Sequence, residues 1–347
     1  MADEAESALD DALGRLEAFD SELANGLTNH APMVVEALTA LGRSDEVTGW
    51  LDHYLTEARP ARASAAALDP ENWQAWLGDV RLESAWRTLF ELELGKEDWR
   101  EVLSRWLPRL APGFAAAAAH GPIRTAHAVR SLARRSSPVR IRELAGGLAL
   151  WAASHQRLPG DPPAGRGVLA AAEALSRVPL VAESRRRNSG SITDALTVLA
   201  EENGFPRAVA ALDTASHWEA LSLEIAEAIA GLFVEQVDTP LEAIVFTHAI
   251  TGMGAARRLG ALVEASTARS LVLHAWQTGC ALYAAYGRPL RRREAAGVLL
   301  PHDVVDAAVA HGDEHVIKLA EVCVELEALT GNPVFLAAAE RCRRAIP

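Results

Sequence analysis

The sequence predicts an all-α protein, because apolar residues recur at helical spacing of three and four along most of its 347 positions. Half of the residues are hydrophobic, which is ample for a packed core. Alternating β-branched and aromatic runs, which indicate strands, are almost absent. The helical periodicity covers residues 4–19, 33–41, 84–94, 98–106, 191–202, 217–234, 261–286 and 313–329.

The clearest predicted loop is a stretch rich in proline and glycine at residues 158–167. The two helical halves on either side of it have similar composition, so we predict a single domain over residues 1–347. Asn25-Gly26 is a dipeptide typical of hairpin turns, but it lies inside an otherwise helical context.

Charge and composition exclude several function classes. The net charge of −12 argues against nucleic acid as the main partner. The arginine runs 185–187 and 291–293 lie in polar stretches and are predicted to be solvated loops or helix ends. No apolar run reaches the roughly 18–20 residues of a membrane span. The N-terminus has no signal pattern, so we expect a cytoplasmic protein.

The cysteines favour neither a disulfide framework nor a thiolate zinc site. They are odd in number and lack the C-x-x-C spacing. The three are Cys280, Cys323 and Cys342.

Only two of the 34 basic residues are lysines, Lys96 and Lys318. A GC-rich coding bias would explain this excess of arginine together with the abundance of alanine. Under such a bias, each remaining lysine is a candidate for a task that arginine cannot perform. Chance retention is the simpler alternative, and we assign it to Lys96, which lies in an ordinary polar turn.

Five tryptophans are concentrated between residues 73 and 106. Large aromatic residues at helical spacing predict core packing. The alternative is an aromatic wall for a flat substrate. The five are Trp73, Trp76, Trp86, Trp99 and Trp106.

Several of the eleven histidines lie at positions suited to metal binding. His30 and His120 each precede by two residues a proline that opens a helical pattern. The positive end of the helix dipole disfavours imidazolium there and favours the neutral form that binds metals. Simple helix capping is the alternative. His248 follows a capping box at residues 239–242, and if buried it needs a partner, which a hydrogen bond would satisfy. His127, seven residues after His120, is a reserve ligand.

His315 and Lys318 lie three residues apart at a helix start capped by Gly312 or Asp313. Lysine is normally protonated, but burial, a nearby cation and a helix N-terminus all lower its pKa. A neutral amine can react with carbon dioxide to give a carbamate, which can bind a metal, whereas arginine cannot do so. This is a physical reason for lysine at position 318. A surface lysine beside a surface histidine is the alternative.

Five segments of the sequence, in this order along the chain, resemble the questin oxidase family. Together they span nearly the whole chain. They are N-H-x-P-M at 29–33, a tryptophan-rich run at 86–110, H-G-x-I-R-T-A-H-A-V-R at 120–130, T-H-A-x-T-G at 247–252 and D-x-H-x-x-K at 313–318. The resemblance implies fungal relatives that cleave an anthraquinone ring, a Baeyer–Villiger-type oxidation in aromatic polyketide biosynthesis. It also implies a mononuclear non-haem iron site built from several histidines and a carboxylated lysine.

Carried onto this sequence, the resemblance implies metal ligands at His30, His120, His248, His315 and Lys318. Arg124 stands where the fungal proteins tend to have another histidine, so we expect a substrate other than questin. Arg124 and His127 are then candidate catalytic residues, with Arg124 stabilising negative charge on the substrate.

The function expected from the sequence is therefore an oxygen-dependent oxidation of an aromatic polyketide at Fe(II), which suits a nitrogen and oxygen ligand set. An external reductant such as NADPH is compatible with this reaction, although no nicotinamide or flavin motif marks a site for it. Two alternatives stay open. One is a metal-dependent hydrolase or lyase on the same ligands, and the other is a non-catalytic helical binding protein, in which the five ligand candidates do not converge.

Overall fold

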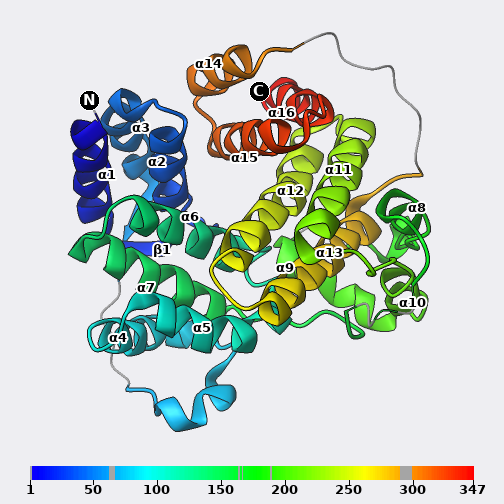
Figure 1. Ribbon diagram of the computed structural model, residues 1–347, viewed down its shortest axis with the longest axis horizontal. Coiled ribbons are helices and arrows are strands. Elements are labelled where there is room, and N and C mark those ends of the chain that lie inside the picture. Colours follow the sequence, from blue (N-terminus) through cyan, green and yellow to red (C-terminus); the bar gives the residue numbers. More distant parts are fainter. Residues whose placement is uncertain (1, 62–66, 163–164, 166, 188–189, 290–298) are drawn as a thin grey trace.

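The computed structural model describes residues 2–61, 67–162, 165, 167–187, 190–289 and 299–347 (Figure 1). The arginine run 291–293 and part of the predicted loop, residues 163, 164 and 166, lie outside the described residues.

Most of the described part of the chain is helical. The α-helices are α1 Ala2–Leu16, α2 Ala31–Ala40, α3 Val47–Tyr54, α4 Glu83–Leu94, α5 Trp99–Leu110, α6 His120–Arg134, α7 Pro138–Ala153, α8 Ala171–Ser176, α9 Ile192–Leu196, α10 Phe205–Val209, α11 Trp218–Gln236, α12 Pro240–Gly260, α13 Ala265–Tyr286, α14 Pro301–His311, α15 Glu314–Thr330 and α16 Val334–Ala345. Short 3-10 helices join them at Ser44–Glu46, Leu55–Glu57, Pro70–Trp76, Val80–Leu82, Ala111–Gly113, Glu183–Arg185 and Thr197–Glu201.

The predicted all-α class is confirmed, and each periodic segment contains a helix. The segment 191–202 divides into α9 and the 3-10 helix Thr197–Glu201. Helix α7 was not among the periodic segments. Its second half, residues 144–153, is buried on all sides, so no polar face exists to produce a helical period.

One small sheet corrects the prediction for the N-terminal segment. Helix α1 ends at Leu16, and β1 Phe19–Leu23 pairs antiparallel with β2 Ala58–Pro60. Asn25-Gly26 forms the turn after β1, with Gly26 at φ 80° and the Leu27 N–H donating to Asn25 Oδ1 at 2.9 Å. The strand exists because of a partner far along the chain, which local periodicity does not detect.

Four helices that are distant in sequence pack in a closed ring: α2 contacts α6, α6 contacts α12, α12 contacts α15, and α15 contacts α2. The main hydrophobic core extends through α6, α12 and α15. A second, smaller core joins α1, α2 and α3 and receives Ile317 from α15. In Figure 1, α15 accordingly runs between the N-terminal helices and α12. The ring of four helices therefore lies where the two hydrophobic cores meet.

The tryptophan-rich segment is part of the main core, as the helical spacing predicted. Trp86 and Trp106 are fully buried and in edge-on contact, with ring centroids 5.7 Å apart. Trp73 packs on Trp106 at the same separation. Within the described residues, no ring contact joins these side chains to the histidines discussed below. The structure thus supports the core interpretation over the aromatic wall.

The structure can be compared with two predictions from the sequence, one on the cysteines and one on membrane spans. The three cysteines are buried and free. Among the described residues, no helix combines the length and apolar character that crossing a membrane requires.

Candidate metal centre

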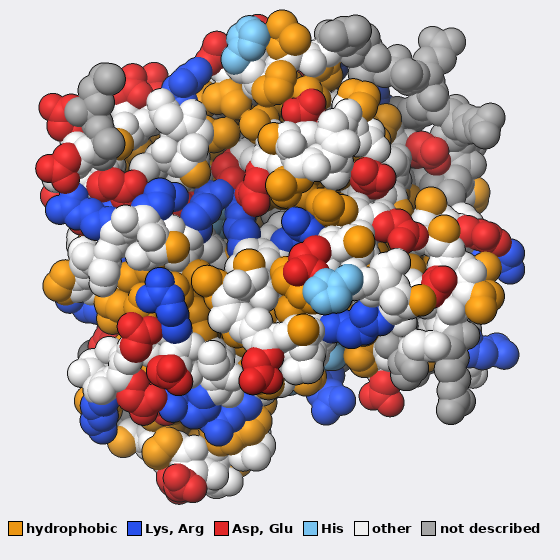
Figure 2. All heavy atoms as spheres, in the orientation of Figure 1, with side chains coloured by type: hydrophobic (Ala, Val, Ile, Leu, Met, Phe, Trp, Pro, Cys, Tyr) orange, Lys and Arg blue, Asp and Glu red, His pale blue; other side chains and the backbone are white. Residues whose placement is uncertain are grey.

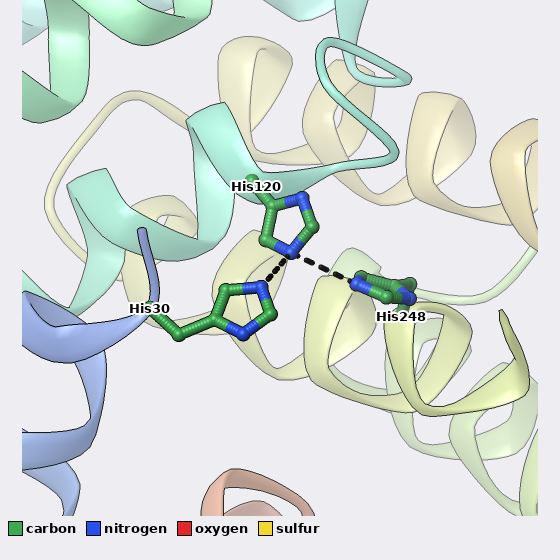
Figure 3. A group of neighbouring side chains, drawn as sticks. All are labelled: His30, His120 and His248. Carbon is green, nitrogen blue, oxygen red and sulfur yellow. Dashed lines mark hydrogen bonds between the residues drawn. The ribbon is translucent and has the colours of Figure 1, made fainter. Parts of the chain in front are cut away.

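Four histidines converge, one from each helix of the ring. His30 Nε2 lies 2.6 Å from His120 Nε2, and His248 Nε2 lies 2.9 Å from the same atom (Figure 3). His315 completes the group beside His30 and His248. The distances between imidazole centroids, taken in the order of the four helices, are 4.6 Å for His30–His120, 4.5 Å for His120–His248, 5.7 Å for His248–His315 and 4.7 Å for His315–His30. Each histidine is at least nine-tenths buried.

The helix starts place three of these side chains. His30 is the N-cap of α2 and His120 the first residue of α6, each with proline in the first turn, as predicted. Asp313 caps α15 by accepting hydrogen bonds from the backbone N–H groups of His315, at 2.8 Å, and Val316. His248 lies in the middle of α12 instead, after the predicted capping box of Thr239 and Glu242, which is present.

The backbone before His120 is strained. Ala117, Ala118 and Ala119 have φ values of 47°, 59° and 70°, a left-handed turn that costs an L-residue roughly 1–2 kcal/mol each. This turn brings the Ala117 carbonyl back to His120 Nδ1, with which it forms a short hydrogen bond. Strain held at one place in this way is typical of a functional site.

Hydrogen bonds fix the protons on two of the imidazoles. His120 Nδ1 must donate to the Ala117 carbonyl, and His30 Nδ1 lies 3.2 Å from the acceptor Glu314 Oε1. In their neutral forms, both rings therefore carry the hydrogen on Nδ1 and a lone pair on Nε2. Two Nε2 lone pairs then face each other across 2.6 Å with no proton between them. A cation between them would turn this repulsion into attraction.

The spacing of these nitrogens suits a shared metal ion. Imidazole nitrogens bind first-row metals at about 2.0–2.1 Å, so two of them at right angles lie about 2.9 Å apart. The observed separations of 2.6 and 2.9 Å are close to this value. His30, His120 and His248 are thus able to bind one metal ion.

Burial keeps three of these imidazoles neutral. It lowers the pKa of His30 and of His120 well below the usual value, and the positive charge of Lys318 lowers both further. Burial also lowers the pKa of His248, with His120 as the next cause. The prediction attributed neutrality to the helix dipole, whereas loss of hydration is the main cause. Neutral imidazole is the form that binds metals.

Lys318 is 1 % exposed and lies one turn after His315. Its ammonium group makes no hydrogen bond or ion pair with any described residue. Burial lowers the pKa of Lys318 to about 8, although the carboxylates of Glu314 and Asp313 act in the opposite direction. An unpaired buried amine is costly, and metal binding or carboxylation would relieve this cost.

The two candidate catalytic residues lie farther along α6, and each is paired with a carboxylate. Arg124 forms two hydrogen bonds with Glu143, at 2.7 and 2.8 Å. His127 Nδ1 lies 2.6 Å from Glu36 Oε2, and its buried Nε2 has no hydrogen-bond partner among the residues that the structure describes. The structure therefore brings neither residue into hydrogen-bonding contact with the four histidines within the described part of the chain.

Three residues around the site were not singled out from the sequence. Glu314 contacts His30, Tyr54 accepts a hydrogen bond from the His30 N–H, and Glu36 contacts His127. Glu314 is one of the variable positions in D-x-H-x-x-K, so its neighbour His315 drew the attention. No sequence signal marks Tyr54 or Glu36 as site residues, and only the fold brings Tyr54 to His30 and Glu36 to His127.

Fold and site together define an all-α protein with a buried centre of four histidines and one lysine. The chain belongs to the questin oxidase-like family, whose model matches residues 27–323 and so covers most of the chain. All five predicted ligands lie within the match. Membership implies an oxidoreductase that acts on aromatic polyketide-type substrates. No curated protein matches the chain in sequence.

Proposed function

We propose that this protein is an oxygenase that uses a mononuclear non-haem Fe(II) centre to oxidise and cleave a ring of a polycyclic aromatic polyketide. The ligands are His30, His120, His248, His315 and Lys318 as its carbamate. The observation that carries the proposal is the 2.6 Å separation of His30 Nε2 and His120 Nε2, to which the neighbouring acceptors assign facing lone pairs. A hydrogen bond does not account for this contact, because both ring hydrogens lie on Nδ1.

The carbamate would form when the neutral amine of Lys318 adds carbon dioxide and releases one proton. A pKa of about 8 leaves a useful fraction of this amine neutral near pH 7. The carbamate is a carboxylate, so it supplies the negative charge that imidazole ligands lack. Oxygen and nitrogen donors of this kind suit Fe(II).

Bound iron would supply the one-electron chemistry that dioxygen requires. In a Baeyer–Villiger-type oxidation, one oxygen atom enters the bond between the carbonyl carbon and its ring neighbour and gives a lactone. A two-electron reductant such as NADPH would reduce the other oxygen atom to water. Addition of one water molecule to the lactone carbonyl would then break the ester bond and open the ring. The burial of the four histidines keeps bulk water away from the reacting atoms.

We further propose that Arg124 and His127 serve the substrate from α6. Arg124 uses Nε and Nη2 for Glu143, and its Nη1 makes no hydrogen bond with a described residue. That nitrogen is suited to a phenolate or enolate oxygen. The Nε2 of His127 likewise has no partner in the described part of the chain, while Glu36 holds its Nδ1.

Metal analysis of the purified protein tests the proposal. We expect close to one iron per chain in the wild type and in Lys96→Ala, because Lys96 is exposed and lies in a turn. Lys318→Ala and Lys318→Arg should both lose the metal, since neither side chain can be carboxylated. A short carboxylate such as propionate should restore metal binding to Lys318→Ala, because it replaces the missing oxygen donor.

Oxygen consumption with an aromatic polyketide and NADPH tests the reaction. Consumption that requires the substrate and is lost in Lys318→Arg supports the oxygenase. Substrate turnover without oxygen consumption would support the hydrolase or lyase instead. Absence of metal from the wild type, even after anaerobic incubation with Fe(II) and bicarbonate, would rule out the proposed centre.

A further inference from the structure

Glu314 is the carboxylate closest to the four converging histidines, and its place in the sequence predicts no role for it. It is the first residue of α15, and its side chain is 26 % exposed. Its Oε1 lies 3.2 Å from His30 Nδ1 and 3.9 Å from His315 Nδ1. Glu314 thus stands on the outer side of two predicted ligands, where the buried centre meets solvent.

Two roles fit a carboxylate in this position. It can accept the Nδ1–H of His30 and so direct the His30 Nε2 lone pair to the metal. Alternatively, Glu314, His30 Nδ1 and His315 can bind a second metal ion, since their donor atoms lie within 4.8 Å of one another. The second role requires His30 to lose both ring hydrogens and bridge two cations. The first requires only the neutral imidazole that burial already favours.

Helix α3 fixes the position of Glu314 relative to His30. The Tyr54 hydroxyl accepts a hydrogen bond from the His30 N–H at 2.9 Å, and Trp50 Nε1 donates to the Gly312 carbonyl at 2.7 Å. Trp50 and Tyr54 lie one helical turn apart and stack, with ring centroids 4.8 Å apart. One pair of side chains therefore contacts both the backbone of His30 and the loop that leads to Glu314.

We propose that Glu314 is a positioning residue, which holds His30 in the tautomer and orientation that metal binding requires. The proposal rests on the proposed function only in taking His30 as a ligand. Carboxylates that accept the outer N–H of a metal-binding histidine orient the ring and make it more basic. The stacked pair on α3 keeps this carboxylate within reach of the ring.

Cobalt(II) titration of the metal-free protein tests this role without depending on turnover. Binding is followed by the visible absorption of the cobalt. We expect one cobalt per chain in the wild type, and about 10–100-fold weaker binding in Glu314→Ala. Glu314→Gln keeps an acceptor but loses the charge, so its affinity should lie between the two. The cobalt spectrum should change in both variants. Glu327→Gln, on the same helix, should match the wild type.

Tyr54→Phe adds an independent measurement, since it keeps the stacked ring and removes the acceptor for the His30 N–H. It should weaken cobalt binding less than Glu314→Ala does. Equal affinity and spectrum in wild type, Glu314→Gln and Glu314→Ala would overturn the positioning role and leave the proposed centre intact. Two cobalt ions in the wild type and one in Glu314→Ala would assign Glu314 to a second metal position instead. No cobalt binding by the wild type would overturn both proposals.

Glu314→Gln protects the test against misfolding. The side chain is partly exposed and the change preserves its size, so the variant should fold. Circular dichroism melting curves would establish this before the titration.

Discussion

Ala117, Ala118 and Ala119 adopt a left-handed conformation immediately before a predicted metal ligand. Glycine would adopt the same φ values without steric cost. Alanine at these positions therefore carries a conformational strain energy, which the packing around His120 must offset. The benefit is a carbonyl directed at His120 Nδ1, which sets the tautomer of that ring.

Replacing an alanine of a helix with glycine usually lowers the free energy of unfolding, but replacing one of these three alanines should not. Ala117→Gly removes a left-handed strain of roughly 1–2 kcal/mol, partly offset by the greater entropy of glycine in the unfolded chain. We expect the free energy of unfolding to stay constant or rise by up to about 1 kcal/mol. Urea denaturation measures this change.

The matched control is Ala328→Gly, at an exposed right-handed position of α15. It should lower the free energy of unfolding by roughly 1 kcal/mol, the ordinary cost of glycine in a helix. A loss of the same size in Ala117→Gly would show that the left-handed turn is not strained.

Helices α2, α6 and α15 share a layered arrangement. Each begins near a site histidine, and each carries a charged or polar partner of a buried network six or seven residues later. These pairs are His30 and Glu36, His120 and His127, and His315 and Glu321. At 1.5 Å per residue, the network lies about 9–10 Å along the helices from the histidines. Its carboxylates, Glu36 and Glu321, therefore support the centre without belonging to it.

Arg130 joins the layer across three helices. It forms ion pairs with Glu36 of α2 and with Glu321 of α15. Arg134 and His127 also contact Glu36, and Arg258 of α12 contacts Glu321. In Figure 2, basic side chains form a band across the face of the molecule near α6, with acidic side chains beside them. Burial alone would raise the pKa of Glu36, but Arg130 and His127 hold it well below its usual range.

Removing Glu36 should be costly, because it leaves two arginines and a histidine without their shared carboxylate. We expect Glu36→Ala to lower the free energy of unfolding by about 3–5 kcal/mol. The control is Glu173→Ala, which breaks the exposed pair with Arg177 on the surface. That change should cost less than about 1 kcal/mol. Equal effects in urea denaturation would mean that the network does not hold the helices together.

At the scale of the whole molecule, the buried imidazoles link stability to pH. Burial lowers the folded pKa of His30, His120, His127 and His248. Their stability contribution is complete above the unfolded pKa of about 6.5. Below it, the unfolded chain takes up protons that the folded protein resists, and stability falls until the folded pKa is reached.

The metal-free protein should therefore lose stability on acidification from pH 6.5 to 5. Each of these imidazoles contributes a slope of up to about 1.4 kcal/mol per pH unit. Urea denaturation at a series of pH values measures the total slope. A stability that does not vary across this range would contradict the burial of neutral imidazoles.

Much of the site was accessible from the sequence because its signals are local. A proline two residues after His30 and His120 marks a helix start, and Asp313 marks the start of α15. The scarcity of lysine directed attention to Lys318, and its burial agrees with a special role. The β1–β2 pair and the partners of Arg124 and His127 carry no such local signal, since they depend on residues far away in the chain.

The sequence by itself determined the helices, their starts and the residue types able to bind a metal, because propensity, capping and periodicity act within a few residues. Only the tertiary structure decided that His30, His120, His248 and His315 meet. It also decided that Glu314 lies beside His30 Nδ1, that the Ala117 carbonyl accepts from His120 Nδ1, and that Lys318 is buried without a partner among the described residues. These features arise from the packing of α2, α6, α12 and α15 in a closed ring, and such packing is a property of the whole chain.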